Sequence, residues 1–361
     1  MRRFLVLVLN LLAVAYLLWQ YPEAQGDFAV YRVGGEILAN GGSLYAGPVW
    51  GDLLFTYTPF AALTFTPFTV IPYAPGSLLF TVLTYLALAA VLLVVLRRPS
   101  RVAVVLPLTL LLEPVRATLG FGQINILLLL LVVLDCLVDS PRWPRGLLVG
   151  IAAAIKLTPL VFLVFFLVKR DRRAAVVTLV TFASCAVLGW LFAPASSLDF
   201  WTRAVFDTNR IGSLAFFGNE SLRGMLAKVA VIPPAVQFLL WALGSVVVLY
   251  LAVRGIRRAG TGQALVLCAL AGLLISPISW SHHWVWLVPA VLLLADRRLA
   301  LTGVVLMALC SIDPVGGLVL AVGGYFWFAL AVLVKAARPA VPDARPTELS
   351  PAGRRPSPQP A

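Results

Sequence analysis

Two charged residues lie where a very apolar chain can least easily accommodate them. Asp27 follows the first apolar run, and Lys156 lies inside a later apolar stretch. Leaving an ionisable group near the apolar layer of a membrane costs several kcal/mol, so such groups usually have a function. An isolated acid and an isolated cation at these places indicate chemistry on a lipid-borne anionic substrate.

The chemistry that such groups support is transfer of a group from an anionic lipid to a hydroxyl. The carboxylate of Asp27 can take the proton of an attacking hydroxyl. A leaving phosphate develops negative charge, which a cation or an imidazole can stabilise. The candidates to contact this phosphate are Lys156, Arg32 and one of His282 and His283.

The only two histidines of the chain, His282 and His283, are adjacent and lie among tryptophans. Neighbouring residues on a helix point about 100° apart, so at most one of the two should face a given cavity. An aromatic belt at the membrane interface would explain the same residues without a function. A metal site needs more ligands with suitable spacing, so the sequence predicts neither a metal nor another cofactor.

Four further polar residues, all expected on one face of the membrane, are candidate substrate-binding residues: Gln123, Asn125, Asn219 and Glu220. Each also has a structural interpretation. Gln123 or Asn125 could cap a helix over 123–138. Glu220 could simply be solvated in an exterior loop.

Asp27 and Lys156 have structural alternatives as well. Aspartate is a favoured helix cap, so Asp27 could cap a helix over 28–40. Lys156 could snorkel towards the membrane surface or pair with another side chain.

The elements that hold these residues are expected to be membrane helices. The chain has 361 residues, of which 61% are hydrophobic and 12% charged, and its mean hydropathy is +0.97. A soluble domain is nearer to half apolar and a quarter charged. The net charge of +13 does not indicate nucleic acid, because Lys and Arg collect in the cytoplasmic loops of membrane proteins. The composition therefore predicts an all-α polytopic membrane protein and excludes a soluble enzyme with an anchor.

About ten segments are candidates to span the bilayer, which takes about 20 apolar residues. They are 4–19, 76–96, 102–119, 123–138, 174–193, 232–253, 262–280, 283–295, 299–312 and 318–335. The four cysteines lie in or beside apolar runs and far from one another, which predicts buried thiols rather than disulfides.

Two further apolar regions, 53–72 and 145–168, are expected to be broken or re-entrant. If either crossed the membrane completely, the basic clusters that follow would lie on the exterior side, against the positive-inside rule. The tip of the second region is Lys156-Leu157-Thr158-Pro159, where proline blocks helix continuation. Lys156 is therefore expected at depth, facing an internal cavity.

The remaining segments then alternate, with both termini cytoplasmic and the segment 20–52 outside. Residues 1–335 are expected to form one transmembrane domain. Residues 336–361 are rich in Pro, Ala and Arg and are expected to be a disordered cytoplasmic tail.

Six motifs in order along the chain resemble glycosyltransferase family 87, which has the GT-C fold. They are Asp27-Phe28-Ala29-Val30-Tyr31, Tyr57-Thr58-Pro59-Phe60, Gly122-Gln123-Ile124-Asn125, Lys156-Leu157-Thr158-Pro159, Gly218-Asn219-Glu220-Ser221 and the segment from Ile275 to Trp284.

The resemblance implies an α-mannosyltransferase that uses a polyprenyl-phosphate-mannose donor and a lipid-linked mannoside or lipoglycan acceptor. It implies Asp27 as the general base, and it associates Lys156 and His282 or His283 with the donor phosphate. It further implies an active site on the exterior face of the plasma membrane, as in actinobacteria. Since such donors carry a β-linked sugar phosphate, an α product implies inversion by a single displacement, for which one base is enough.

Two alternatives remain open from the residues. The sugar could be arabinofuranose, also transferred from its polyprenyl phosphate. A lipid flippase or another transporter would also have broken helices and intramembrane charge. The absence of an inverted repeat in the sequence and the gathering of polar motifs on one face favour the enzyme.

Overall fold

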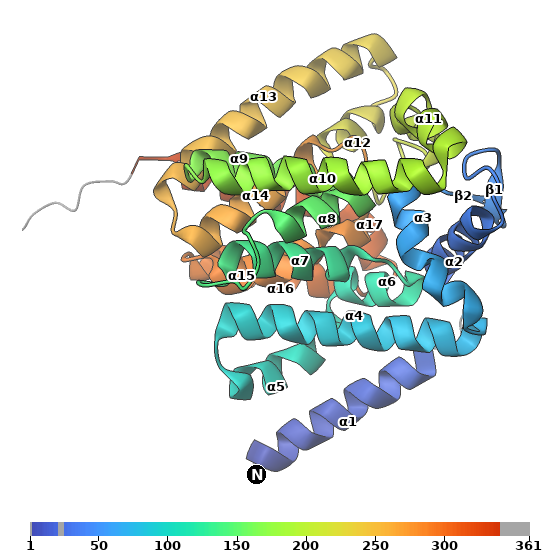
Figure 1. The fold of residues 1–361 in the computed structure, drawn as a ribbon. Coiled ribbons are helices and arrows are strands. Elements are labelled where there is room, and N and C mark those ends of the chain that lie inside the picture. The colour runs from blue at the N-terminus through green and yellow to red at the C-terminus, as the bar shows by residue number, and fades with distance from the viewer. Residues whose placement is uncertain (1, 21–24, 340–361) are drawn as a thin grey trace, which may run out of the picture.

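The computed structural model describes residues 2–20 and 25–339 of the chain (Figure 1). The first half contains α1 (Arg2–Gln20), α2 (Gly26–Ala39), β1 (Pro48–Trp50), β2 (Leu53–Leu54), α3 (Pro59–Phe65), η1 (Thr66–Val70), α4 (Tyr73–Leu96), α5 (Pro99–Leu108), η2 (Thr109–Leu111), α6 (Glu113–Phe121), α7 (Asn125–Leu137), α8 (Leu147–Ile155), η3 (Thr158–Val161), α9 (Phe162–Val168) and α10 (Arg172–Phe192). The second half contains α11 (Pro194–Thr202), η4 (Ala204–Phe206), η5 (Thr208–Arg210), α12 (Leu222–Ala227), α13 (Pro234–Arg258), α14 (Thr261–Ile275), η6 (Ser281–Trp286), α15 (Leu287–Leu293), α16 (Arg297–Leu309), α17 (Val315–Ala321) and α18 (Gly324–Ala337).

The chain is mostly helical, as predicted, but it is not all-α. β1 and β2 form a small antiparallel hairpin at 48–54. Of the tail predicted over 336–361, residues 340–361 lie outside the described part, and α18 continues to Ala337.

Fewer helices than predicted are long enough to cross a membrane by themselves. Among the described residues, three helices are long and apolar enough to cross a membrane: α4, α10 and α13. The count rises to five if each of two bent pairs is one span. The predicted helix 102–119 is such a pair, bent by 76° at Leu112, directly before Glu113 and Pro114 open α6. The predicted helix 318–335 is the other, bent by 52° beside Gly323, whose φ is +82°. The predicted count of about ten spans is therefore not confirmed.

α4 and α10 run roughly parallel, whereas α1 and α13 cross the bundle obliquely (Figure 1). α7 packs against α4 and α8, and α8 packs against α10. The elements α2, α3, β1, β2 and α11 lie together at one end, which we call the α2 end.

The region 145–168 is broken where the sequence predicts, at Lys156. α8 ends at Ile155, and Lys156 has an extended backbone with φ −142° and ψ 129°. Arg145 and Lys169, which flank the region, line the same cavity, together with Arg97. The segment therefore enters the bundle and returns to the side from which it came.

The region 53–72 is also broken, as predicted. It contains β2, the seven-residue helix α3 and the short η1. The hydroxyl of Thr58 accepts a hydrogen bond from the amide of Ala61 and donates one to the carbonyl of Ala154 in α8. Thr58 thus caps α3 and ties it to the end of α8, next to Lys156.

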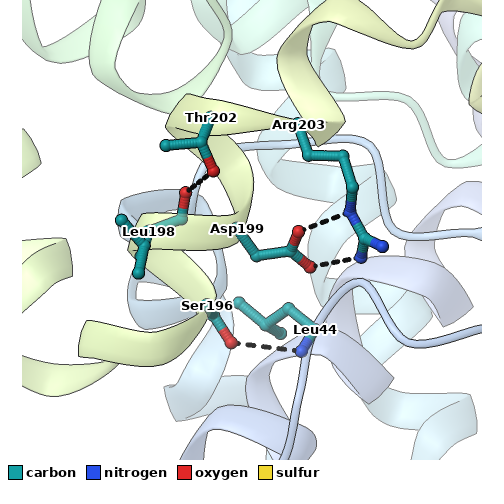
Figure 2. A network of polar contacts seen from close by, with 6 residues as sticks. All are labelled: Leu44, Ser196, Leu198, Asp199, Thr202 and Arg203. Carbon is teal, nitrogen blue, oxygen red and sulfur yellow. Dashed lines mark hydrogen bonds and ion pairs between the residues drawn. The ribbon is translucent and has the colours of Figure 1, made fainter.

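Polar contacts of α11 join it to the segment that precedes β1 (Figure 2). The amide of Leu44 donates to the hydroxyl of Ser196 over 3.2 Å. Arg203 binds Asp199 through two hydrogen bonds of 2.7 and 2.8 Å. This pair lies within α11 and its C-cap and is solvent-exposed, so it contributes little to stability. The buried Leu44 contact is the one of these that joins α11 to the segment before β1.

The four cysteines are free and buried, which confirms the prediction from their apolar surroundings. They are Cys136, Cys185, Cys268 and Cys310.

Candidate active site

Asp27 is held by the tight packing of α2 at the α2 end. Gly34 and Gly35 face neighbouring elements so closely that a Cβ on Gly34 would lie 2.4 Å from the ring of Phe55 and one on Gly35 would lie 2.9 Å from the amide nitrogen of Thr66. The interpretation of Asp27 as a helix cap is wrong, because α2 begins at Gly26 and its N-cap is Gln25. Asp27 lies inside the first turn, so its carboxylate is left for another role.

The surroundings of Asp27 make it a stronger base than an ordinary aspartate. Burial raises the pKa of its carboxyl from 3.8 to about 6, against the smaller opposite effects of a hydrogen bond with Gln123 and the charge of Lys156. A carboxylate with this pKa is still ionised at neutral pH and accepts a proton more readily than a solvated one.

Lys156 lies at the centre of a cluster of polar side chains. Its Nζ donates to Oδ1 of Asn125 over 3.1 Å and lies 3.3 Å from Nε2 of His283. It also lies 5.6 Å from the centre of the Tyr57 ring. Neither hydrogen-bond partner of Lys156 is a carboxylate, and the carboxylate whose charge acts on it is that of Asp27.

Gln123 connects Asp27 to a pair of buried tyrosines. Its Oε1 accepts hydrogen bonds from the hydroxyls of Tyr31, over 3.0 Å, and Tyr57, over 3.3 Å. The two hydroxyls lie 2.9 Å apart. Because Oε1 is occupied by the tyrosines, the amide nitrogen is the group that Gln123 can offer to Asp27. Gln123 is therefore not a cap of α7, whose N-cap is Ile124.

The two histidines face different cavities. Their rings lie 4.6 Å apart and nearly perpendicular, at 87°. His283 lines a small cavity of about 60 Å³ together with Lys156 and Asn125. His282 lines a larger cavity of about 920 Å³. The expectation that at most one histidine faces a given cavity is confirmed.

The main chain between the two cavities is fixed by the carbonyl of His282. It accepts hydrogen bonds from the hydroxyl of Thr118, over 3.0 Å, and from Nδ2 of Asn125, over 3.1 Å. Asn125 thus binds Lys156 with its oxygen and the histidine segment with its nitrogen.

Asn219 and Glu220 lie within the frame of the site. Oδ1 of Asn219 accepts from the amide of Ser279 over 3.0 Å, and Asn219 forms a β-bridge with Trp280. Oε2 of Glu220 accepts from the first amides of α18, those of Tyr325 and Phe326, each over 3.1 Å. Both side chains are buried. They therefore position the histidine segment and α18, and Glu220 is not solvated.

Arg32 joins α2 to η1. Its guanidinium donates to the carbonyls of Thr69, over 3.2 Å, and Ile71, over 3.4 Å, and lies 4.0 Å from Glu36. Within the described part of the chain, its hydrogen bonds lead to η1 rather than to the cluster around Lys156.

Sequence reasoning missed several residues around the site. Tyr31 and Tyr57 lie inside recognised motifs, but their hydroxyls could not be told from those of a membrane belt. Glu113 and Arg116 line the larger cavity. Two charges inside the apolar run 102–119 were the available signal for them.

Comparison with known proteins assigns the family. Residues 55–277 match the model of glycosyltransferase family 87. A protein of Mycobacterium tuberculosis is 38% identical, covering 93% of this chain and 91% of the relative. A protein of Mycolicibacterium smegmatis is 35% identical, covering 91% and 88%. Both relatives are described as polyprenol-phosphate-mannose-dependent α-(1-2)-phosphatidylinositol mannoside mannosyltransferases.

A solved structure of ArnT from Cupriavidus metallidurans bound to undecaprenyl phosphate covers 93% of this chain and 78% of its own, at 16% identity and a TM-score of 0.41. A similarity of this size carries no argument about the site. The match to the family model and to the two mycobacterial relatives shows that this chain belongs to glycosyltransferase family 87.

Proposed function

We propose that this protein transfers a mannosyl residue from polyprenyl-phosphate-mannose to a phosphatidylinositol mannoside, at the exterior face of the plasma membrane. The observation that carries the proposal is the cluster of Lys156, Asn125 and His283 within reach of the charge of Asp27. It combines a group that binds an anion with a group that accepts a proton. The names of the two mycobacterial relatives support mannose and this acceptor.

In the proposed reaction, the oxygen of an acceptor hydroxyl attacks the anomeric carbon of the donor, and Asp27 takes the proton of that hydroxyl. The bond between that carbon and the phosphate oxygen breaks on the opposite face, which turns a β-linked donor into an α-linked product. The electron pair leaves with the polyprenyl phosphate, whose charge Lys156 and His283 stabilise.

Each contact of the cluster has a role in this scheme. Gln123 orients the carboxylate of Asp27 and is itself fixed by Tyr31 and Tyr57. Asn125 holds the Nζ of Lys156 in place. We assign positioning roles to Asn219, Glu220 and Arg32.

The membrane arrangement that goes with this function is a GT-C-type fold with about ten crossings, in which several helices are too short or too bent to count as full spans. Both termini would be cytoplasmic, and residues 1–335 would act as one domain. The α2 end, where Asp27 lies, would face the exterior.

The test is transfer by the purified protein, with labelled polyprenyl-phosphate-mannose or polyprenyl-phosphate-arabinose and a phosphatidylinositol mannoside acceptor. We expect mannosyl transfer by the wild type and a loss of at least about 1,000-fold in Asp27→Asn, since the general base is removed. Asp52→Asn, which changes an exposed carboxylate of the β1–β2 turn, should retain full activity.

Lys156→Met in the same assay should raise the KM for the donor more than the KM for the acceptor. Lys169→Met is its control, because Lys169 also donates to a carbonyl, that of Ala259, but away from the cluster. Transfer of arabinose alone would replace the donor in this proposal. Movement of intact lipid across vesicles without transfer of either sugar would replace it with a flippase.

A further inference from the structure

None of the residues assigned to the donor lines the larger cavity. It has a volume of about 920 Å³ and lies between α1, α6, the segment 212–218, η6 and the 310–320 region. This volume is near the upper end of the range of small-molecule sites, which is about 300–1,000 Å³. The cavity beside Lys156, of about 60 Å³, holds only a few water-sized groups.

The two cavities differ in charge. Lys156 and His283 line the small cavity, and no carboxylate is among the described residues that line it. The large cavity is lined by Glu113, Asp313 and Arg116. Glu113 accepts a hydrogen bond from the hydroxyl of Tyr325, and Arg116 donates one to the carbonyl of Ser311. The small cavity therefore suits an anion such as phosphate, whereas the large one, lined by residues of both charges and by Ser213 and Ser281, suits a neutral polyhydroxylated ligand.

His282 offers a polar atom that nothing within the described residues uses. Its side chain is buried, at 8% exposure, and its Nε2 has no hydrogen-bond partner there. The same residue lines the large cavity. Leaving a buried polar atom unpaired costs stability, and a ligand hydroxyl in the cavity would supply the missing hydrogen bond.

Aromatic side chains supply the other feature of a sugar site. Phe121, Phe216 and Trp280 line the cavity, and the Phe121 ring, 48% exposed, stands 5.3 Å from the His282 ring. Flat apolar faces beside hydrogen-bonding groups match the alternating apolar and hydroxyl faces of a sugar.

The position of the cavity relates it to Asp27. Phe121 lines the cavity, and Gln123, two residues later, contacts Asp27. We propose that the cavity lined by Glu113, Arg116, Phe121 and His282 binds the mannosylated head group of the lipid acceptor, so that His282 faces the acceptor and the adjacent His283 faces the donor phosphate. This inference rests on the proposed function.

The test uses three single variants of the full chain: Arg116→Gln, Phe121→Ala and His282→Phe, which keeps an aromatic ring but removes both ring nitrogens, Nε2 included. We expect each to raise the acceptor KM by about 3- to 30-fold, the effect of losing one such contact. The donor KM should change less than twofold. Arg101→Gln, an exposed arginine outside the cavity, should change neither.

A rise in the donor KM, an equal rise in both constants, or no rise in any of the three variants would overturn the assignment. A second measurement separates this inference from the proposed function, namely equilibrium binding of a radiolabelled short-chain phosphatidylinositol dimannoside. If the wild type transfers no mannose, the proposed function fails, and weaker binding by the three variants would still support the site. Equal binding by wild type and variants, or no binding, would reject it.

Discussion

At the residue scale, each of the two charges is held by a neutral amide side chain, Asp27 by that of Gln123 and Lys156 by that of Asn125. Asp27, Lys156 and one histidine stand out because a charge or imidazole is expensive in an apolar chain. The structure brings Lys156 into contact with Asn125 and His283, which the sequence expected to approach from the other face of the membrane. Arg32, Asn219 and Glu220 could not be sorted from the site by sequence, because a buried polar side chain may bind a ligand or a main-chain amide equally well.

The raised pKa of Asp27 gives a prediction on activity and pH. Its carboxyl must be ionised to act as a base, and burial raises its pKa to about 6. The rate at saturating substrates should therefore fall by half near pH 6 and about tenfold for each further pH unit below it. A pH profile of kcat measured between pH 4.5 and 8 checks this.

The same carboxyl should affect the stability of the protein in the opposite direction, because its ionisation, which activity needs, destabilises the fold. A carboxyl whose pKa is higher in the folded state stabilises the fold below its unfolded pKa, near 3.8, and loses this contribution as pH rises through about 6. Asp27→Asn should therefore melt at or above the wild-type temperature at pH 7.5. A wild-type activity profile that is flat down to pH 4.5, or a variant that melts lower at pH 7.5, would contradict the assigned pKa.

At the element scale, hydrophobic runs predicted where helices lie, and local chemistry decided how they break. The predicted helices 76–96 and 174–193 appear as Tyr73–Leu96 and Arg172–Phe192, because uninterrupted apolar runs have few alternatives in a membrane. The 76° bend inside 102–119 was not predicted, although Glu113-Pro114 marks it. The hairpin at 48–54 was missed since its strands are three and two residues long.

The loop between α6 and α7 gives a prediction at this scale, because it carries both Gln123 and Asn125. Gly122 has φ +66°, and a Cβ there would lie 2.7 Å from Cβ of Phe28 and 2.9 Å from Oε1 of Gln25. Gly122→Ala should displace the loop, cost more than about 2 kcal/mol and lower kcat at least about tenfold. Thermal unfolding and transfer rates in detergent measure both effects.

Gly41→Ala is the matched control for this loop. Gly41 has a similar φ of +69°, but no atom lies within 4 Å of the added Cβ. The backbone strain is therefore the same, about 1–2 kcal/mol, and the clash is absent. If the two variants lose equal stability and keep equal activity, the packing of Gly122 on α2 does not position the site.

At the scale of the whole molecule, the ends of the helices sort into two groups. Arg97, Arg145 and Lys169 line one cavity, whereas Trp19, Glu113 and His282 line another. These three basic residues thus lie around one cavity, as the positive-inside rule requires of the clusters beside a re-entrant segment. The positions of the charged residues along the chain predict this sorting. These positions do not predict which short helices cross the membrane completely, since a few residues at each bend decide that.

The re-entrant course of 145–168 leads to a prediction on side exposure. Ser140 precedes the region and Arg172 follows it, and both are exposed. If the segment enters and returns, Ser140→Cys and Arg172→Cys should both be protected from a membrane-impermeant maleimide in intact cells and both react after permeabilisation. Ser213→Cys, in the segment beside the larger cavity, should react in intact cells.

The four native cysteines are buried, so background labelling should be low. Labelling of Arg172→Cys without Ser140→Cys in intact cells would mean that the segment crosses the membrane, and Lys156 would then lie in a span rather than at the tip that meets Asn125 and His283.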